Sequence, residues 1–368
     1  MALEMTSRHT QESHSSTLDT EKIRHPAWLY EVLPDKSVRC HLCATECRIP
    51  VGKRGVCHVR QNIDGTLYTL VYDRIISQHV DPIEKKPLYH FYPGSSAYSI
   101  ATPGCNFHCP WCQNWDISQL TRDEVLVAGK KVSAEEIVAV AQSRSCLSIA
   151  YTYTEPTVFF ELAYDTARLA HASNLRNIYV TNGYMSNQML SVFQKFLDAA
   201  NVDLKAFRDE TYRRHIGARL QPILDNMKRM KELGIWLEVT SLIIPGLNDD
   251  PIEMREMAAF IAQELGPDTP WHISRYFPAY QMTDRPPTPM RTLKLAFEIG
   301  REAGINHVYM GNVHQGSYTK CANCGQVLIE RYGYKVFVNR VKDSHCPYCG
   351  AVVVGVGMSG NDWRQLTP

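Results

Sequence analysis

The sequence predicts an α/β fold in which parallel strands alternate with crossover helices, flanked by two small cysteine-rich modules. The first observation is a series of short apolar runs in residues 93–315 that alternate with segments of helical periodicity. The second is the distribution of the twelve cysteines, eleven of which fall in three tight groups, one in each of three segments of the chain. The third is that polar residues gather where the expected strands end.

The expected strands are rich in apolar and β-branched residues, and they occupy residues 98–104, 147–155, 177–183, 201–207, 236–246, 271–278 and 307–312. Helical patterns lie between most of them, with a start signal at Ser133 and stop signals at Gly234 and Gly304. Six or seven such strands can form a doubly wound sheet or a full or partial barrel. In each of these folds the chemistry lies at the C-terminal ends of the strands.

Composition limits the class of protein. The chain has 368 residues, a net charge of +1 and 21% charged residues, so no basic surface for nucleic acid or membrane is expected. No apolar stretch is long enough to cross a bilayer, and the N-terminus does not resemble a signal peptide. Residues 1–22 are polar and expected to be disordered. Grouped thiols favour metal sites in a cytoplasmic protein over disulfides.

An N-terminal module is expected at residues 23–92. It contains Cys40, Cys43, Cys47 and Cys57, whose short spacings predict one shared site. A structural zinc ion and a second iron–sulfur cluster both fit this set of ligands.

A C-terminal module is expected at residues 316–368. Its two Cys-x2-Cys knuckles, Cys321/Cys324 and Cys346/Cys349, are separated by 21 residues, and each is followed by glycine. This pattern predicts a zinc-ribbon or rubredoxin-like module, with zinc favoured over iron.

The central segment, residues 93–315, carries Cys105, Cys109 and Cys112 in the spacing Cys-x3-Cys-x2-Cys, directly after its first expected strand. Three thiolates are one fewer than a closed metal site requires. On a [4Fe–4S] cluster they leave one iron open to a small chelating ligand.

These residues resemble a known family. The stretches "CHLCATECRIPVGKRGVCHVRQNIDGTLYTLVY", "PGCNFHCPWCQNWDISQ", "YTYTEPTVFFE" and "VDLKAF" are similar to the radical S-adenosylmethionine (SAM) superfamily. Within it they resemble pyruvate formate-lyase-activating-enzyme-like proteins, and the radical SAM enzyme of the AmmeMemoRadiSam system over about residues 38–312. The resemblance implies a partial (β/α)6-type TIM barrel. It also implies an oxidoreductase whose cluster cleaves SAM to methionine and a 5′-deoxyadenosyl radical, which abstracts hydrogen from substrate.

The resemblance also implies residues that contact SAM. Tyr153-Thr154-Glu155 stands where the superfamily has a Gly-Gly-Glu-like stretch, and Asp203-x-Lys205 matches an Asp-x-Lys motif in which lysine meets the SAM carboxylate. The full set of implied contacts is Trp111, Tyr153, Thr154, Glu155, Thr181, Asn182, Asp203, Lys205 and Tyr280.

The substrate and the residues that act on it are not assigned, although Arg275 is a candidate for an anionic group. The resemblance implies Memo-like and AMMECR-type partner proteins and an electron donor such as flavodoxin or ferredoxin. Two alternatives stay open: an electron-transfer or scaffold protein with several iron–sulfur or zinc centres, and an aldolase that uses Lys205 as a Schiff base.

Overall fold

The computed structural model describes residues 24–119, 121 and 128–359. The tail expected at residues 1–22 lies outside them. Among the described residues, no helix combines the length and the apolar character that a membrane crossing needs.

A central sheet of eight strands organises the fold, in the order β16-β15-β14-β13-β12-β11-β9-β8. Seven of the strands run parallel: β9 (Ser96–Ala101), β11 (Ser148–Tyr151), β12 (Arg176–Thr181), β13 (Ala199–Asp203), β14 (Trp236–Ile243), β15 (Trp271–Arg275) and β16 (Val308–Gly311). All four residues of β11 are buried, as in a parallel sheet covered on both faces. The predicted α/β fold with a central parallel sheet is confirmed.

Strand β8 (Ser77–Pro82) is the eighth strand and pairs antiparallel with β9. The sheet therefore begins earlier in the chain than the boundary expected at residue 93. Periodicity did not indicate this strand because three consecutive residues, from Gln78 to Val80, are exposed.

Six helices connect successive parallel strands: α3 (Ala134–Ser143), α4 (Phe160–Ala172), α5 (Asn187–Phe193), α7 (Gln221–Glu232), α8 (Pro251–Phe260) and α9 (Met290–Glu302). Their starts follow from capping chemistry: Ser133 and Glu136 form a reciprocal capping box at α3, and Ser186 accepts a hydrogen bond from Met189 N at α5. The shorter helical turns are η2 (Ile83–Lys85), α1 (Trp115–Ser118), η3 (Pro156–Phe159), α6 (Asp209–Thr211), η4 (Tyr212–Ile216) and η5 (Ile261–Leu265).

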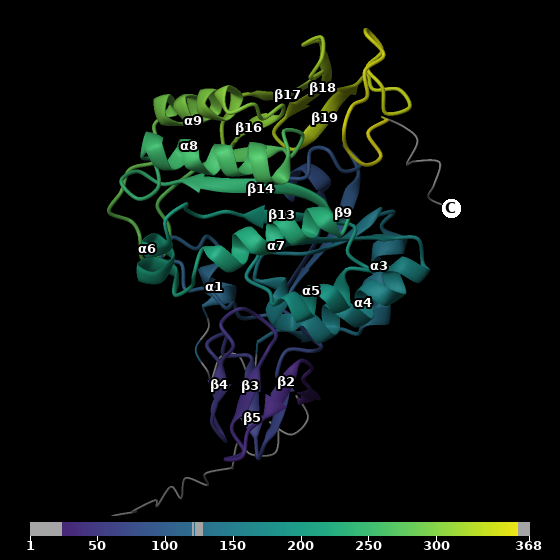
Figure 1. Ribbon diagram of the computed structural model, residues 1–368. Helices are drawn as coiled ribbons and strands as arrows, with labels where there is room; N and C mark the ends of the chain where they lie inside the picture. Colours follow the sequence, from purple (N-terminus) through teal and green to yellow (C-terminus); the bar gives the residue numbers. More distant parts are fainter. Residues whose placement is uncertain (1–23, 120, 122–127, 360–368) are drawn as a thin grey trace, which may run out of the picture.

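The N-terminal module lies at one end of the molecule, below the sheet in Figure 1. It consists of two small antiparallel sheets, β1-β6-β5 and β2-β3-β4, with the bounds β1 (His25–Pro26), β2 (Tyr30–Val32), β3 (Val38–Cys40), β4 (Arg48–Ile49), β5 (Arg60–Ile63) and β6 (Thr66–Thr69). A buried pair joins it to the central domain: both Nη atoms of Arg60 donate to the Glu161 carboxylate on α4, at 3.1 and 2.8 Å. Strand β7 (Arg74–Ile75) pairs with β10 (Lys130–Lys131).

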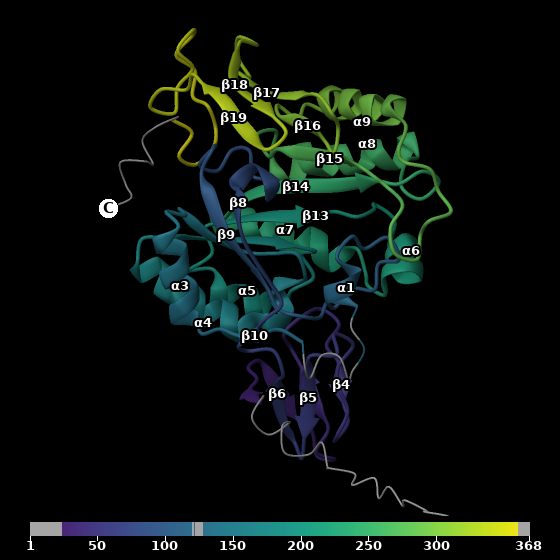
Figure 2. The same cartoon turned by 180° about the vertical axis from the view of Figure 1, so that it is seen from behind.

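The C-terminal module lies at the opposite end, beside β16 and β8 (Figures 1 and 2). Its strands β17 (Gly316–Lys320), β18 (Val327–Tyr332) and β19 (Lys335–Asn339) form an antiparallel sheet. Arg331 is buried and donates to the Tyr89 carbonyl at 2.8 Å, to Thr319 at 2.8 Å and to Glu84 at 3.4 Å. The module therefore contacts the segment after β8, at the opposite edge of the sheet from β16.

Candidate functional site

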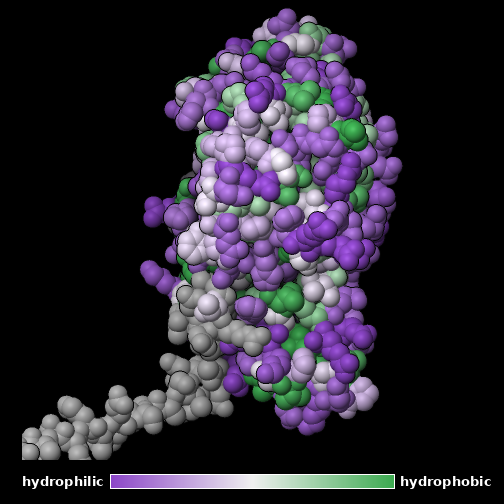
Figure 3. Space-filling model, turned by 90° about the vertical axis from the view of Figure 1, so that its left-hand side faces the viewer, coloured by the Kyte–Doolittle hydropathy of each residue, from purple (hydrophilic) through white to green (hydrophobic). Residues whose placement is uncertain are grey.

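A cavity of about 470 Å³ is lined by the loops that follow the parallel strands. The arrows of β13 and β14 in Figure 1 point toward this side, and Figure 3 shows that side as a mainly polar face with scattered apolar side chains. The residues that line the cavity are Lys85, Lys86, Cys105, Phe107, Cys109, Trp111, Cys112, Gln113, Asn114, Ser118, Gln119, Thr152, Tyr153, Thr154, Glu155, Val180, Thr181, Asn182, Asp203, Lys205, Thr240, Leu242, Ser274, Asn312 and Tyr334.

The three thiols of Cys105, Cys109 and Cys112 share the wall of this cavity. The described residues that line it include no fourth cysteine and no histidine. Burial raises the pKa of Cys105 well above its ordinary value and that of Cys109 to about 12, so without a cation the buried thiols would stay protonated. Three soft ligands facing open space fit an iron–sulfur cluster with one uncommitted iron.

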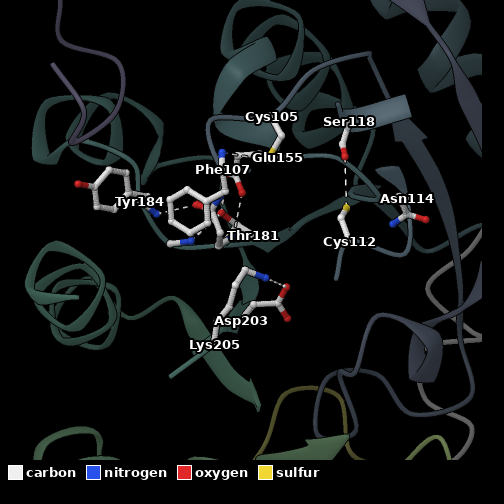
Figure 4. A network of polar contacts seen from close by, with 12 residues as sticks. Cys105, Phe107, Cys112, Asn114, Ser118, Glu155, Thr181, Tyr184, Asp203 and Lys205 are labelled. Carbon is white, nitrogen blue, oxygen red and sulfur yellow. Dashed lines mark hydrogen bonds and ion pairs between the residues drawn. The ribbon is translucent and has the colours of Figure 1, made fainter. Parts of the chain in front are cut away.

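The loop that carries these thiols is held at both ends. Phe107 N donates to Cys105 Sγ at 3.4 Å, and Ser118 Oγ lies 3.3 Å from Cys112 Sγ (Figure 4). The Asn114 side chain donates to the Tyr153 carbonyl at 2.8 Å, which ties this loop to the one after β11. The cysteine loop and the Tyr153 loop are therefore positioned together.

Glu155 organises the ends of β11 and β12. Its carboxylate is buried and accepts four hydrogen bonds: from Thr157 N at 3.1 Å, Thr157 Oγ1 at 2.6 Å, Thr181 Oγ1 at 2.7 Å and Asn182 N at 2.8 Å (Figure 4). Burial raises the pKa of Glu155, and these hydrogen bonds oppose the rise. Three of these donors meet Oε1 and one meets Oε2, so the carboxylate fixes the two loops relative to each other.

Asp203 is the last residue of β13, and Lys205 lies two positions further on. Lys205 Nζ is 3.0 Å from Asp203 Oδ2 (Figure 4). Tyr212 OH accepts from Lys205 N at 3.0 Å, and Asn248 Nδ2 donates to Lys205 O at 2.8 Å, which fixes the lysine backbone. Burial opposes the positive charge, but the Asp203 carboxylate outweighs it and raises the pKa of Lys205. The side chain is therefore a fixed cation in the cavity.

A second cationic group lines the cavity from the segment after β8. Lys85 Nζ and Lys86 Nζ both contact the Asp81 carboxylate, at 2.8 and 2.6 Å, and Tyr153 OH donates to the same carboxylate. Burial, only partly offset by Asp81, lowers the pKa of Lys86 to about 8. Sequence reasoning missed these lysines because it assigned them to the N-terminal module. The available signal was the "EKKP" stretch at residues 84–87, ten residues before the first expected strand.

Of the other residues with implied SAM contacts, some line the cavity and one lies outside it. Trp111 and Thr154 line the cavity, whereas Tyr280 is not among its lining residues and stacks on Trp115 at a centroid distance of 5.2 Å. Arg275 also lies outside the lining residues; its Nε donates to the Thr288 carbonyl at 2.9 Å. The neighbouring Ser274 faces the cavity instead.

The two flanking cysteine groups differ in geometry. Cys321, Cys324, Cys346 and Cys349 place their sulfurs within 4.8 Å of one another, with the pairs Cys321–Cys349 and Cys324–Cys346 both at 3.7 Å. This group fits a metal-binding module. The N-terminal four, Cys40, Cys43, Cys47 and Cys57, line a second, separate cavity together with Arg60 and Val158.

The chain is similar in sequence and in fold to known proteins. Residues 99–258 match the family model of the Radical SAM superfamily. The chain is 45% identical over 328 residues to the uncharacterized protein MJ0808 of Methanocaldococcus jannaschii, covering 88% of this chain and 97% of that protein. It is 23% identical over 164 residues to the pyruvate formate-lyase-activating enzyme of Clostridium pasteurianum, covering 43% of this chain and 66% of the enzyme. A crystal structure of a domain of pyruvate-formate lyase-activating enzyme from Bacteroides vulgatus aligns with a TM-score of 0.39 and 16% identity, covering 45% of this chain and 99% of that domain.

Proposed function

Because the chain belongs to the family of MJ0808 and contains a radical SAM domain homologous to pyruvate formate-lyase-activating enzymes, we propose that it is a radical SAM enzyme of the AmmeMemoRadiSam type. The observation that carries the proposal is the set of three thiols, Cys105, Cys109 and Cys112, around a cavity whose described lining adds no fourth cysteine or histidine. A closed structural site would complete its ligand set, whereas this one is open toward a cationic lysine.

The three thiols would hold a [4Fe–4S] cluster. When bound, the cluster and SAM supply a one-electron cleavage that yields methionine and a 5′-deoxyadenosyl radical able to abstract hydrogen from substrate. Lys205, fixed beside Asp203 and near Cys109, would bind the SAM carboxylate as a charged donor.

Glu155 would act through its neighbours, because its carboxylate already accepts four hydrogen bonds. It would hold Thr181 and Asn182 at the end of β12 while the backbone at Tyr153 and Thr154 faces SAM. Trp111 would form an apolar wall of the cavity. Tyr280 would reach SAM only if its stack on Trp115 opened.

The remaining assignments complete the proposal. The order of strands and helices supports a partial (β/α)6 barrel, with the C-terminal module as a zinc ribbon. A low-potential donor such as flavodoxin or ferredoxin would reduce the cluster, and a reducing compartment, the cytoplasm, would suit it. The substrate would be a partner protein, with Memo-like and AMMECR-type proteins as the first to test, or a small molecule.

The test is anaerobic assay of the iron-loaded protein with SAM and dithionite. We expect 5′-deoxyadenosine and methionine in equal amounts, and loss of both in a variant with Cys105, Cys109 and Cys112 changed to alanine. A protein that binds iron and sulfide but forms no 5′-deoxyadenosine would instead be the electron-transfer or scaffold protein. Borohydride trapping of a carbonyl substrate on Lys205 without iron would indicate the aldolase. Incubation with deuterated candidate substrates would then show which one transfers deuterium to 5′-deoxyadenosine.

A further inference from the structure

The four N-terminal thiols are not gathered in the way the C-terminal four are. In a tetrahedral site with metal–sulfur bonds of about 2.3 Å, the sulfurs lie about 3.8 Å from one another. Within the described part of the chain, the C-terminal four are the one group of three or more candidate ligands whose atoms all lie within 4.8 Å of one another. Cys40, Cys43, Cys47 and Cys57 line one cavity without forming such a close group, and the same holds for the Cys105 group.

The cavity between these thiols contains an unused hydrogen-bond donor. Arg60 lines it with a buried Nε that has no hydrogen-bond partner, although its Nη atoms are held by Glu161. A free buried donor beside four thiols that share one cavity favours thiolates bound to a polynuclear centre.

Hydrogen bonds link this group to the Cys105 group. Asn106, next to Cys105, is buried, and its Oδ1 accepts from Asn182 Nδ2 at 2.8 Å. Asn182 Oδ1 in turn accepts from Tyr184 N at 3.0 Å, and the Tyr184 carbonyl accepts from the residue after Cys43. Residues next to a cysteine of each group are thus joined by hydrogen bonds.

The backbones of the two groups also meet. Gly104 adopts φ +101°, and a Cβ there would lie 3.0 Å from the Cys57 carbonyl. Ala44 N donates to Tyr184 O at 2.9 Å, next to the bridge between Cys43 and Met185. In Figure 1 and Figure 2, α1, the helix after the Cys105 loop, lies just above the N-terminal module.

We propose that Cys40, Cys43, Cys47 and Cys57 bind a second iron–sulfur cluster, which passes electrons to the cluster site of Cys105, Cys109 and Cys112 across the close approach of Gly104 to Cys57. A low-potential one-electron donor of the ferredoxin or flavodoxin class is oxidised by one electron and the N-terminal cluster is reduced by one. That electron moves to the second site without making or breaking a bond. Cys47 is half-buried whereas the other three are buried, so electrons enter at the Cys47 side. The use of the electron at the Cys105 site rests on the proposed function.

The first test measures metal in protein purified anaerobically without added iron. Wild type should contain about eight irons, as many sulfides and about one zinc per chain, the zinc at the C-terminal thiols. The variant C105A/C109A/C112A should keep about four irons and about one zinc, with a visible spectrum that bleaches on reduction. About two zincs and no iron in this variant would overturn the proposal. The variant has no SAM site, so the result does not depend on SAM chemistry.

The second test measures contact between the clusters by electron paramagnetic resonance after reduction. Wild type should give a spectrum that is broadened and relaxes faster than that of C105A/C109A/C112A, because two nearby reduced clusters couple magnetically. A wild-type spectrum equal to the sum of two isolated clusters would overturn the electron-transfer step. Replacing Cys43 with serine should reduce the coupling while the Cys105 cluster stays assembled; an unchanged spectrum would also contradict the assignment.

Discussion

At the scale of single residues, Lys205 is the cation to which the proposed function assigns the SAM carboxylate. Replacing it with methionine keeps much of the length and the apolar stem but removes the charge. A hydrogen bond to a charged group contributes about 1.5–3 kcal/mol, so SAM affinity should fall about 10- to 150-fold in equilibrium binding measurements on the cluster-loaded protein.

The matched control for that variant is Lys228→Met, which removes a lysine that is partly exposed and pairs with Glu264 at 3.6 Å, away from the residues lining the cavity. It should leave SAM affinity unchanged. If Lys205→Met also binds SAM normally, the carboxylate partner is another residue. If Lys205→Met loses cluster absorbance, Lys205 is needed for folding of the loop that carries Cys105, Cys109 and Cys112.

Lys86 gives a prediction about pH. Its pKa is lowered from 10.5 to about 8 because burial outweighs the attraction of Asp81. NMR of protein labelled at lysine Cε should show one resonance that titrates near pH 8 and is missing in Lys86→Met. Below pH 8 both folded and unfolded chains keep the proton; between pH 8 and 10.5 only the unfolded chain keeps it, so the contribution of this group to stability rises with pH. A midpoint at 10.5 or above would mean that Asp81 outweighs burial.

How far single residues could be predicted depends on whether their element was recognised. Alternation along a strand placed Asp203 and Lys205 on one face, and the structure pairs them at 3.0 Å. The Glu155 network required knowing that Thr181 and Asn182, from the next strand, lie beside it. Lys86 was missed because it follows β8, a strand whose exposed residues hide the period of two.

At the scale of elements, the contact between the cysteine loop and the N-terminal module depends on Gly104. A Cβ there would lie 2.6 Å from Val59 Cγ1, in a backbone conformation that disfavours other residues. Gly104→Ala should therefore destabilise the protein by about 1–3 kcal/mol through overpacking, in addition to backbone strain. The loss of stability is measured by thermal unfolding, and the iron content of the protein purified anaerobically shows whether the cysteine loop is disturbed.

Gly217→Ala supplies the control, because it has φ +81° but nothing within 4 Å of the added Cβ, so it reports strain alone. The double variant Gly104→Ala/Val59→Ala should recover part of the loss by making room. Equal melting temperatures for Gly104→Ala and Gly217→Ala would show that the close approach does not matter.

The elements themselves were largely predictable. The parallel strands and their helices follow from local periodicity and capping residues such as Ser133, which act within a few positions along the chain. The antiparallel β8 depends on pairing with β9, and pairing is a non-local property. Because this pairing is not visible in the local sequence, the N-terminal module was expected to extend to residue 92 and to include β8.

At the scale of the whole molecule, buried ion pairs between distant segments join the three parts of the chain. Arg60 meets Glu161 at a separation of 101 residues, and Arg331 meets Glu84 at a separation of 247 residues. A sequence pattern cannot pair residues so far apart. The cysteine groups could be recognised as sites, but their positions relative to the cavity could not. Tyr334, which follows β18, lines the cavity from the C-terminal module.

This arrangement makes the C-terminal module part of the central domain, which a single substitution tests. Arg331→Met removes the buried guanidinium that contacts Glu84, Tyr89 and Thr319, and leaves the Glu84 carboxylate buried without its cation. Removing one partner of a buried pair typically costs about 3–5 kcal/mol, whereas an exposed pair contributes about 0–1 kcal/mol. The control Arg340→Met breaks the more exposed pair with Glu330, 2.6 Å apart in the same module. Thermal unfolding of the metal-loaded proteins should show a large decrease for Arg331→Met and almost none for Arg340→Met, with zinc content unchanged in both. Equal effects of the two substitutions would mean that the module is held to the sheet by its backbone and apolar contacts, and that the Arg331–Glu84 contact is incidental.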